Sequence, residues 1–212
     1  MARERKQSVR IVARAGLPTR YGDFTILGVE GARPDESAVV LARGPMNGTG
    51  AKSSAGLKPG DAPLVRVHSQ CLTGDVLSSQ RCDCRAQLEL ALAAIGRARC
   101  GLLLYLPQEG RGIGLMNKLR AYEWQDRGMD TVEANLRLGF AADSRDYAFS
   151  AAVLRKLGVR RVRLMSNNPE KVRQLEAAGI EVVERIPCRP RTSRRTHAYL
   201  LTKRTKLGHL LE

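Results

Sequence analysis

The chain has 212 residues, with 36 basic and 21 acidic side chains and a formal net charge of +15 at pH 7. No apolar stretch approaches the roughly 18 residues that cross a bilayer, and MARERKQSVRIVARAG at the N-terminus lacks the apolar run of a signal peptide, so we expect a cytoplasmic protein and no membrane span. Five cysteines, an odd number, argue against a disulfide-stapled scaffold and favour metal binding or catalysis.

Basic side chains gather at the two ends of the chain. Residues 1–14 hold five of them against one acid, and residues 185–206 hold eight and no acid. Such segments can bind nucleic acid, but only 4% of the residues are aromatic, which leaves few rings for stacking on bases. Anionic small substrates or solubility explain the charge equally well. We expect residues 1–8 to be a flexible basic extension, 9–185 a globular domain, and 186–212 a basic segment of that domain.

The N-terminal part of the chain is rich in predicted strands. Apolar and β-branched residues predict strands over residues 9–14, 23–29, 39–42 and 64–68. A turn is expected between the first two strands, at residues 18–22. Glycine, proline and serine dominate residues 43–62, which predicts a long mobile loop.

From residue 64 to residue 185, predicted strands and helices alternate. Helical periodicity predicts helices over about residues 86–97, 113–126, 146–157 and 169–179. Further strands are predicted over residues 102–106, 162–165 and 181–185. The inward faces are expected to carry Leu115, Leu119 and Tyr122 in the second helix, and Tyr147, Ala151 and Leu154 in the third. The alternation predicts a single layered α/β/α domain with a mixed sheet and a strand-rich N-terminal portion.

The clearest chemical signal is a group of three cysteines, Cys71, Cys82 and Cys84, within fourteen residues. The last two immediately precede the helix predicted over 86–97, whose N-terminal dipole stabilises thiolates. Zinc takes four ligands, and catalytic zinc sites keep one position for water. Three thiolates and a water give an open site suited to water attack on a purine carbon. The alternatives are a closed structural site with His68 as the fourth ligand, or no metal.

A glycine-rich segment, PQEGRGIGLMNKLRAY over residues 107–122, has the pattern of an anion site. Its three glycines lie between a predicted buried strand and a predicted helix, where backbone amides and the helix N-terminus can bind phosphate. Arg111, Lys118 and Arg120 add positive charge. The alternative is a tight turn followed by a solvated basic helix face.

Two further segments carry candidate polar residues. In LMSNNPEK, residues 164–171, Lys171 falls in the first turn of a helix, where a cation opposes the helix dipole unless an anion is bound; the alternative is a surface lysine. The polar connection over residues 130–146 contains Asp143 and Arg145. Asp143 could equally be an N-terminal helix cap.

Together these segments resemble the GTP cyclohydrolase II family, the zinc enzymes that open riboflavin synthesis. The resemblance covers about residues 9–212, in the family's order. The matching motifs are RVHSQCLTGD (66–75), RCDC (81–84), QEGRGIGL-NK-RAY (108–122), DTVEAN (130–135), LGFAAD-RD (138–146), NNPEK (167–171) and YL-TK-K-GHLL (199–211).

The resemblance implies a hydrolase that opens the imidazole ring of GTP at C8. Formate and pyrophosphate would leave, giving 2,5-diamino-6-(5-phosphoribosylamino)pyrimidin-4(3H)-one. One zinc ion per chain would be held by Cys71, Cys82 and Cys84, and Mg²⁺ would accompany the triphosphate. Residues 9–185 would then be the catalytic domain, and the family also implies a homodimer.

Site residues follow from matching positions in the family. The implied substrate-binding residues are Arg66, Val67, His68, Ser69, Gln70, Gln87, Glu109, Gly110, Arg111, Thr131, Ser166 and Lys171. Asp143 corresponds to the family's proton acceptor, Arg145 to a nucleophile at the α-phosphate, and Tyr122 to a position close to the guanine ring. Because a guanidinium stays protonated, we expect Arg145 to act as a bidentate clamp on phosphate instead.

One departure from the family pattern concerns Gln70, where family members usually carry glutamate. Glutamine cannot act as a general base, so Glu109 or another group would have to serve. This leaves open a divergent enzyme that opens the ring and releases pyrophosphate but retains the formyl group, in specialised metabolism. A hypothesis of another class is a zinc-stabilised nucleic-acid-binding protein, which the basic ends motivate and which requires His68 as a fourth ligand.

Overall fold

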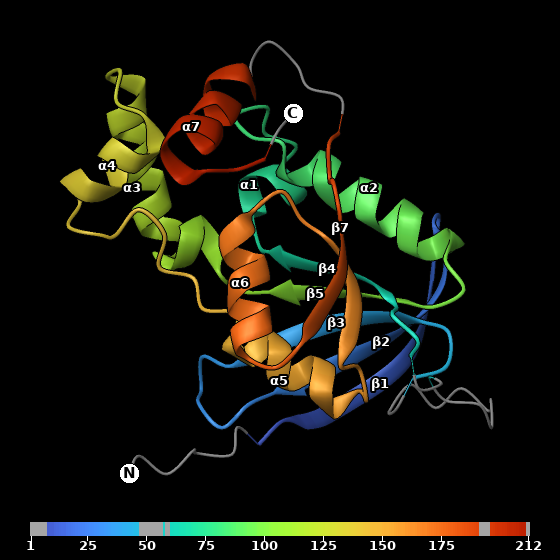
Figure 1. Ribbon diagram of the computed structural model, residues 1–212. Helices are drawn as coiled ribbons and strands as arrows, with labels where there is room; N and C mark the ends of the chain where they lie inside the picture. The colour runs from blue at the N-terminus through green and yellow to red at the C-terminus, as the bar shows by residue number, and fades with distance from the viewer. Residues whose placement is uncertain (1–7, 47–56, 58–59, 191–195, 211–212) are drawn as a thin grey trace.

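The computed structural model describes residues 8–46, 57, 60–190 and 196–210. Within these residues, seven strands form one mixed sheet in the order β1-β2-β3-β5-β4-β6-β7 (Figure 1). The strands are β1 (Arg10–Thr19), β2 (Gly22–Glu30), β3 (Ser37–Arg43), β4 (Leu64–Ser69), β5 (Gly101–Leu106), β6 (Arg161–Met165) and β7 (Glu181–Ile186). The expectations of a flexible extension over 1–8 and a mobile loop over 43–62 fall largely outside the described residues.

The helices lie between and after these strands. They are α1 (Leu72–Asp75), α2 (Cys84–Arg97), α3 (Leu115–Asp126), α4 (Thr131–Arg137), α5 (Ala148–Lys156), α6 (Pro169–Ala177) and α7 (His197–Leu207), with a 3-10 turn, η1 (Glu109–Gly112), before α3. None of the described helices is long and apolar enough to cross a membrane.

Helices cover both faces of the sheet, which confirms the layered α/β/α prediction (Figure 1). Leu102 and Leu104 of β5 share one buried cluster with Leu154 of α5 and Leu175 of α6. Leu103, which points to the opposite face because side chains alternate along a strand, packs in a second cluster that contains Ala91 and Ile95 of α2. The result is a single α/β domain.

The first hairpin is longer than the sequence predicted. Strands β1 and β2 pair from Arg10 opposite Glu30 to Thr19 opposite Gly22, so the turn expected at 18–22 is confined to two residues. Pro18 lies inside β1 although proline has no N–H to donate. An edge strand tolerates this because one side of its backbone needs no partner, and β1 is at the edge of the sheet.

The predicted inward face of the helix over 113–126 is wrong for Leu119 but not for Leu115 and Tyr122, which are half-buried. The helix begins later, at Leu115, because its N-cap residue Gly114 has a positive φ of 83°, which is not helical. Its buried residues are Lys118 and Ala121, whereas Leu119 is 40% exposed. The buried side of α3 faces polar groups rather than the apolar core, so hydrophobic periodicity misjudges its orientation. The corresponding prediction for Tyr147, Ala151 and Leu154 is confirmed, since all three are buried.

The parallel part of the sheet positions the candidate site. β4 lies between β5 and β6 and runs parallel to both, so the carboxyl ends of the three strands meet at one edge. The segments that follow these strands are 70–71, 107–114 and 166–168. Crevices at the carboxyl ends of parallel strands are the usual binding sites of α/β folds.

Candidate active site

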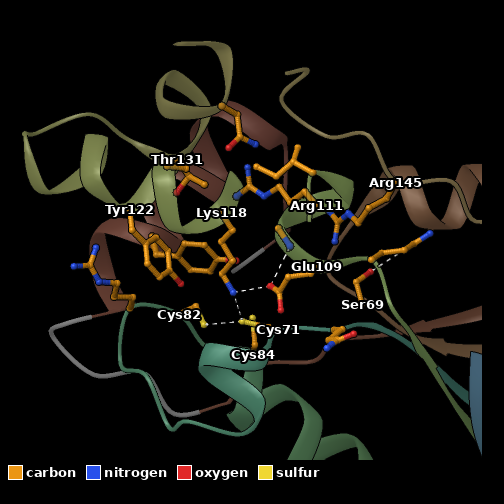
Figure 2. A pocket seen from close by; sticks show the side chains of 18 of the residues that line it. Ser69, Cys71, Cys82, Cys84, Glu109, Arg111, Lys118, Tyr122, Thr131 and Arg145 are labelled. Carbon is orange, nitrogen blue, oxygen red and sulfur yellow. Dashed lines mark hydrogen bonds and ion pairs between the residues drawn. The ribbon is translucent and has the colours of Figure 1, made fainter. Parts of the chain in front are cut away.

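The sulfur atoms of Cys71, Cys82 and Cys84 form one cluster at this edge (Figure 2). Their Sγ atoms all lie within 4.8 Å of one another, and those of Cys71 and Cys82 are 3.7 Å apart. Cys71 follows β4, and Cys84 is the first residue of α2. The cluster therefore joins the end of a central strand to the beginning of a long helix.

Asp75 fixes the backbone that carries Cys71. Its carboxylate accepts hydrogen bonds from the backbone N–H of Cys71 (3.0 Å), the hydroxyl of Tyr105 (2.8 Å) and Nε2 of His68 (3.1 Å). The ring of His68 also stacks on Tyr105, with centroids 5.5 Å apart. Burial lowers the pKa of His68, and the hydrogen bond to Asp75 opposes this only in part, so the ring is neutral.

His68 does not belong to the sulfur cluster. Its Nε2 is bound to Asp75, and the potential ligand atoms that group together in the described residues are those of Cys71, Cys82 and Cys84. The alternative in which His68 closes a structural site as the fourth ligand is therefore wrong for this structure.

The cluster fits a zinc ion. A Cβ atom added to Gly74 would lie 2.9 Å from the Sγ of Cys82 and 3.1 Å from that of Cys71, so the glycine keeps the space beside the sulfurs open. Three cysteine sulfurs at this spacing are a donor set that zinc prefers. The arrangement suggests a zinc site held by Cys71, Cys82 and Cys84.

Lys118 lies against this cluster and also contacts the glycine-rich segment, where the sequence led us to expect it, through Glu109. Its buried ammonium donates to the Sγ of Cys71 (3.1 Å) and Oε1 of Glu109 (2.7 Å), as Figure 2 shows, and also to Oγ1 of Thr73 (2.9 Å). Burial lowers the pKa of Lys118, but the bond to Glu109 and the negative Cys71 outweigh it, and the pKa rises. Contacts with Cys82, Cys84 and Lys118 hold the pKa of Cys71 well below its usual range.

Glu109 links the glycine-rich segment to α1. Its Oε2 accepts from the backbone N–H of Leu72 (2.6 Å), and its Oε1 accepts from the N–H of Gly110 (3.0 Å) as well as from Lys118. Arg111 has a φ of 63°, an uncommon angle for a non-glycine residue, and the glycines at 110, 112 and 114 also have positive φ. Such backbone is typical of functional loops.

A first cavity opens onto the sulfurs. Tyr122 forms part of its wall: its hydroxyl is 3.0 Å from Oγ1 of Thr73, and the Arg81 guanidinium lies over its ring. Nδ2 of Asn135 and Nη2 of Arg111 are buried without a hydrogen-bond partner among the described residues. Both residues line the cavity, and buried polar groups ordinarily have partners, so these donors suit a polar ligand.

A second cavity adjoins the first and is strongly cationic. The basic side chains in its wall are Arg66, Arg111, Arg145, Lys171 and Lys203. Lys171 is 5% exposed, so its interpretation as a surface lysine is wrong. Its ammonium donates to the carbonyl of Val67 (2.7 Å), and its pKa is lowered by burial and by the neighbouring guanidinium groups of Arg66 and Arg145. Such a cavity attracts a polyanion.

Asp143 and Arg145 form a bidentate pair beside the cavities. The carboxylate accepts from Nε of Arg145 (2.8 Å), from its Nη2, and from its backbone N–H (3.1 Å). Burial raises the pKa of Asp143, but Arg145 outweighs burial, so the pKa is lower than usual. The prediction that Asp143 might cap a helix is wrong, because Tyr147 is the N-cap of α5 and Asp146 accepts from the N–H of Ala148.

Nearly all of the site residues that the resemblance implied lie around the two cavities. The first cavity is lined by Ser69, Gln70, Cys71, Cys82, Cys84, Glu109, Gly110, Arg111, Tyr122, Thr131 and Arg145. The second is lined by Arg66, His68, Ser69, Cys84, Gln87, Arg111, Arg145, Ser166 and Lys171. Val67 differs, because its side chain packs in the core and its carbonyl alone meets Lys171. Asp143 reaches the cavities only through Arg145.

Sequence reasoning missed several residues of the same walls. Asn135 of α4 lines the first cavity, Tyr199 of α7 lines both, and Lys203 and His209 line the second. Each of these positions lies in a motif that carried the resemblance, DTVEAN or YL-TK-K-GHLL, which was the available signal.

A thiol cluster beside a cationic cavity at the carboxyl edge of an α/β sheet has the chemistry that suits a metal-dependent enzyme with an anionic substrate. The sequence model of one family, GTP cyclohydrolase II, matches residues 9–187, and the chain belongs to this family.

Curated relatives agree with the family. The chain is 51% identical over 204 residues to GTP cyclohydrolase-2 of Pseudomonas aeruginosa, covering 96% of this chain and 94% of that protein. It is 48% identical over 208 residues to riboflavin biosynthesis protein RibBA of Mycobacterium tuberculosis, covering 98% of this chain and 47% of RibBA. The chain thus spans about half the length of the RibBA proteins that it matches.

Among solved structures, RibBX, a two-domain 3,4-dihydroxy-2-butanone 4-phosphate synthase from A. baumannii, aligns with 76% of this chain and 35% of its own. The TM-score is 0.40 and the sequence identity 19%, which is too low to establish a common fold.

Proposed function

We propose that the chain is a GTP cyclohydrolase II. It opens the imidazole ring of GTP at C8 and releases formate and pyrophosphate, leaving 2,5-diamino-6-(5-phosphoribosylamino)pyrimidin-4(3H)-one, in riboflavin biosynthesis. The observation that carries this proposal is the continuity of the thiol cluster with the cationic cavity: Ser69, Cys84, Arg111, Arg145 and Tyr199 line both spaces.

In this proposal the guanine lies in the first cavity and the triphosphate in the second. The first contains the sulfurs, the ring of Tyr122, Thr131 and the unpartnered amide of Asn135, which suit a planar base with polar edges. The second is lined by arginine and lysine side chains that suit phosphate oxygens. Mg²⁺ accompanies the triphosphate, and the enzyme acts in the cytoplasm as a homodimer.

Cys71, Cys82 and Cys84 hold one zinc ion, which when bound supplies Lewis acidity toward water near C8. Three thiolates give such a centre a net negative charge, and the ammonium of Lys118 offsets it. Burial raises the pKa of Tyr122, so its phenol is neutral and can donate or accept a hydrogen bond beside the base.

Arg145, together with Arg66, Ser166 and Lys171, binds the phosphates. Asp143 holds two nitrogen atoms of the Arg145 guanidinium, which fixes the orientation of that clamp. Because Asp143 has a lowered pKa, it stays ionised and is a weak base. We therefore assign it an orienting role, which its lowered pKa favours over the family's role of proton acceptor.

The extent of deformylation depends on Gln70 and Glu109. Gln70 is an amide and cannot accept the proton. Both oxygen atoms of Glu109 already accept hydrogen bonds, so Glu109 is not a free proton acceptor either. This observation supports a second candidate, the enzyme that opens the ring and releases pyrophosphate but keeps the formyl group. Mass spectrometry of the product from GTP with Mg²⁺ and Zn²⁺ distinguishes the two, since the formylated product is heavier by one CO.

A substitution in the cluster tests the proposed function. Purified protein given GTP and Mg²⁺ should open the ring, and Cys82→Ser should lose both bound zinc and turnover, because one of three thiolate ligands is gone. Cys100→Ala is the control, since Cys100 is a buried core residue outside the cluster. Turnover that survives in zinc-free Cys82→Ser protein would contradict a role for zinc.

A further inference from the structure

The C-terminal helix α7 forms a wall of the second cavity. Tyr199, Lys203, and His209 just beyond the helix line that cavity, and Figure 1 shows α7 next to α4. The sequence marks this region as a basic segment and as a motif shared with the family, without a role for Lys203, yet Lys203 is buried, with 7% of its surface exposed. A buried lysine needs a partner, and the partner of Lys203 connects it to the site.

A continuous chain of hydrogen bonds runs from Lys203 to Arg66. The ammonium of Lys203 donates to Oδ1 of Asp83 (2.7 Å), and Oδ2 of Asp83 accepts from Nε2 of Gln87 (2.5 Å). Oε1 of Gln87 accepts from Nη2 of Arg66 (2.5 Å), whose Nη1 donates to the carbonyl of Met165 (2.9 Å). All four linked side chains are buried.

This series of hydrogen bonds ends on the guanidinium of Arg66, which can bind an anion. Nε of Arg66 is buried and has no hydrogen-bond partner among the described residues, and Arg66 lines the second cavity with Lys171 and Arg145. The amide nitrogen of Gln87 donates to Asp83, and its amide oxygen accepts from Arg66. The carboxylate of Asp83 therefore fixes the orientation of the Gln87 amide, and the amide in turn fixes the orientation of the guanidinium.

We propose that Lys203 is a positioning residue for phosphate binding, which acts through Asp83 and Gln87 to hold Arg66 toward the second cavity. The identity of the anion as the triphosphate of GTP rests on the proposed function. Without the ammonium, Asp83 is a buried carboxylate that lacks its counter-ion, which disturbs its hydrogen bond to Gln87 and, through Gln87, the orientation of Arg66.

Other contacts keep α7 in place when Lys203 is changed. Lys206 pairs with Asp130 and with Glu133 (2.9 Å) of the α4 region, and the N–H of Leu210 donates to the carbonyl of Asn167 (2.9 Å). Removal of the Lys203 ammonium therefore perturbs the orientation of Arg66 more than the position of the helix.

The test compares binding of inorganic triphosphate and of guanosine to the zinc-loaded protein by calorimetry. Lys203→Met should weaken triphosphate binding at least about tenfold and guanosine binding much less, because the relay ends on Arg66 in the second cavity, whereas Lys203 meets the wall of the first cavity through the ring of Tyr199 (4.4 Å). Lys203→Arg, which keeps the charge, should stay within about threefold of the parent protein. Arg204→Met is the matched control: it removes the same charge from the exposed neighbouring position and should change neither affinity.

Three results would overturn the inference: unchanged triphosphate binding in Lys203→Met, an equal loss in Arg204→Met, or an equal loss of guanosine and triphosphate affinity. If Lys203→Met fails to fold, Lys203→Gln makes the same comparison. A parent protein that binds triphosphate in a Lys203-dependent manner but neither binds guanosine nor opens GTP would refute the proposed function and leave the relay intact.

Discussion

Lys118 places a positive charge directly on the thiol cluster, where its ammonium bridges Cys71 and Glu109. Groups that hydrogen-bond to metal ligands commonly change metal affinity by about 10–100-fold when removed. We therefore expect Lys118→Met to weaken zinc binding by about this factor, measured by competition with a chromogenic chelator. Arg120→Met, on the exposed side of the same helix, should leave zinc affinity unchanged. Equal affinities in the parent protein and Lys118→Met would contradict a role for the ammonium at the cluster.

Asp143 makes the stability of the folded state depend on pH. Its pKa is lower than the ordinary value of 3.8 because Arg145 binds its carboxylate and Arg111 adds a smaller favourable charge, although burial acts in the opposite direction. A carboxyl group with a depressed pKa stabilises the folded state above its unfolded pKa, and this contribution is lost as pH falls through the folded pKa.

The free energy of unfolding should therefore differ between the parent protein and Asp143→Asn at pH 6, and the difference should shrink below about pH 4. Urea titrations at several pH values measure it. A difference that is constant from pH 6 to pH 3 would show that Asp143 does not carry this linkage.

At the scale of elements, the short helix α1 fits against the sulfurs only because residue 74 is a glycine. A methyl group there would lie within about 3 Å of two sulfur atoms. We expect Gly74→Ala to reduce the zinc content of the purified protein strongly, as measured by metal analysis, because either α1 or the sulfurs must move. Gly16→Ala in β1, where a Cβ atom meets nothing within 4 Å, is the control. Full zinc occupancy in Gly74→Ala would contradict this view of α1.

The elements that sequence patterns predicted correctly are those that bury apolar residues. β5 and α5 belong to this group, since Leu104 and Leu154 lie in the central core. The patterns failed where an element buries polar residues toward the site. The covered residues of α3 include Lys118, and those of α7 include Thr202 and Lys203. Hydrophobic periodicity cannot identify such faces, because their partners are polar groups far away in the sequence.

At the scale of the whole molecule, the site is assembled from segments that follow different strands. The cysteine spacing and the glycine-rich segment identified its parts, since both patterns are local in the sequence. The contact between Lys203 and Asp83 joins positions 120 residues apart, so no local pattern could predict it. Likewise, the sequence indicated that Lys118 was basic but could not show that it meets Cys71.

Zinc removal should separate activity from folding. The two buried clusters that hold the sheet contain none of Cys71, Cys82 and Cys84. We expect chelation to abolish GTP opening while the far-ultraviolet circular dichroism spectrum is retained, and re-addition of Zn²⁺ to restore turnover. Loss of the spectrum on chelation would show that the metal is needed for the fold, as in small zinc-dependent domains.

The closeness of Cys71 and Cys82, 3.7 Å between sulfur atoms, makes the metal-free protein sensitive to air. Dioxygen can take two electrons and two protons from the pair of thiols, and a disulfide bond then replaces two zinc ligands. After metal removal in air, a thiol titration should detect two fewer free thiols per chain. The protein should then bind no zinc until a phosphine reductant is added. Bound metal would thus protect these cysteines from oxidation.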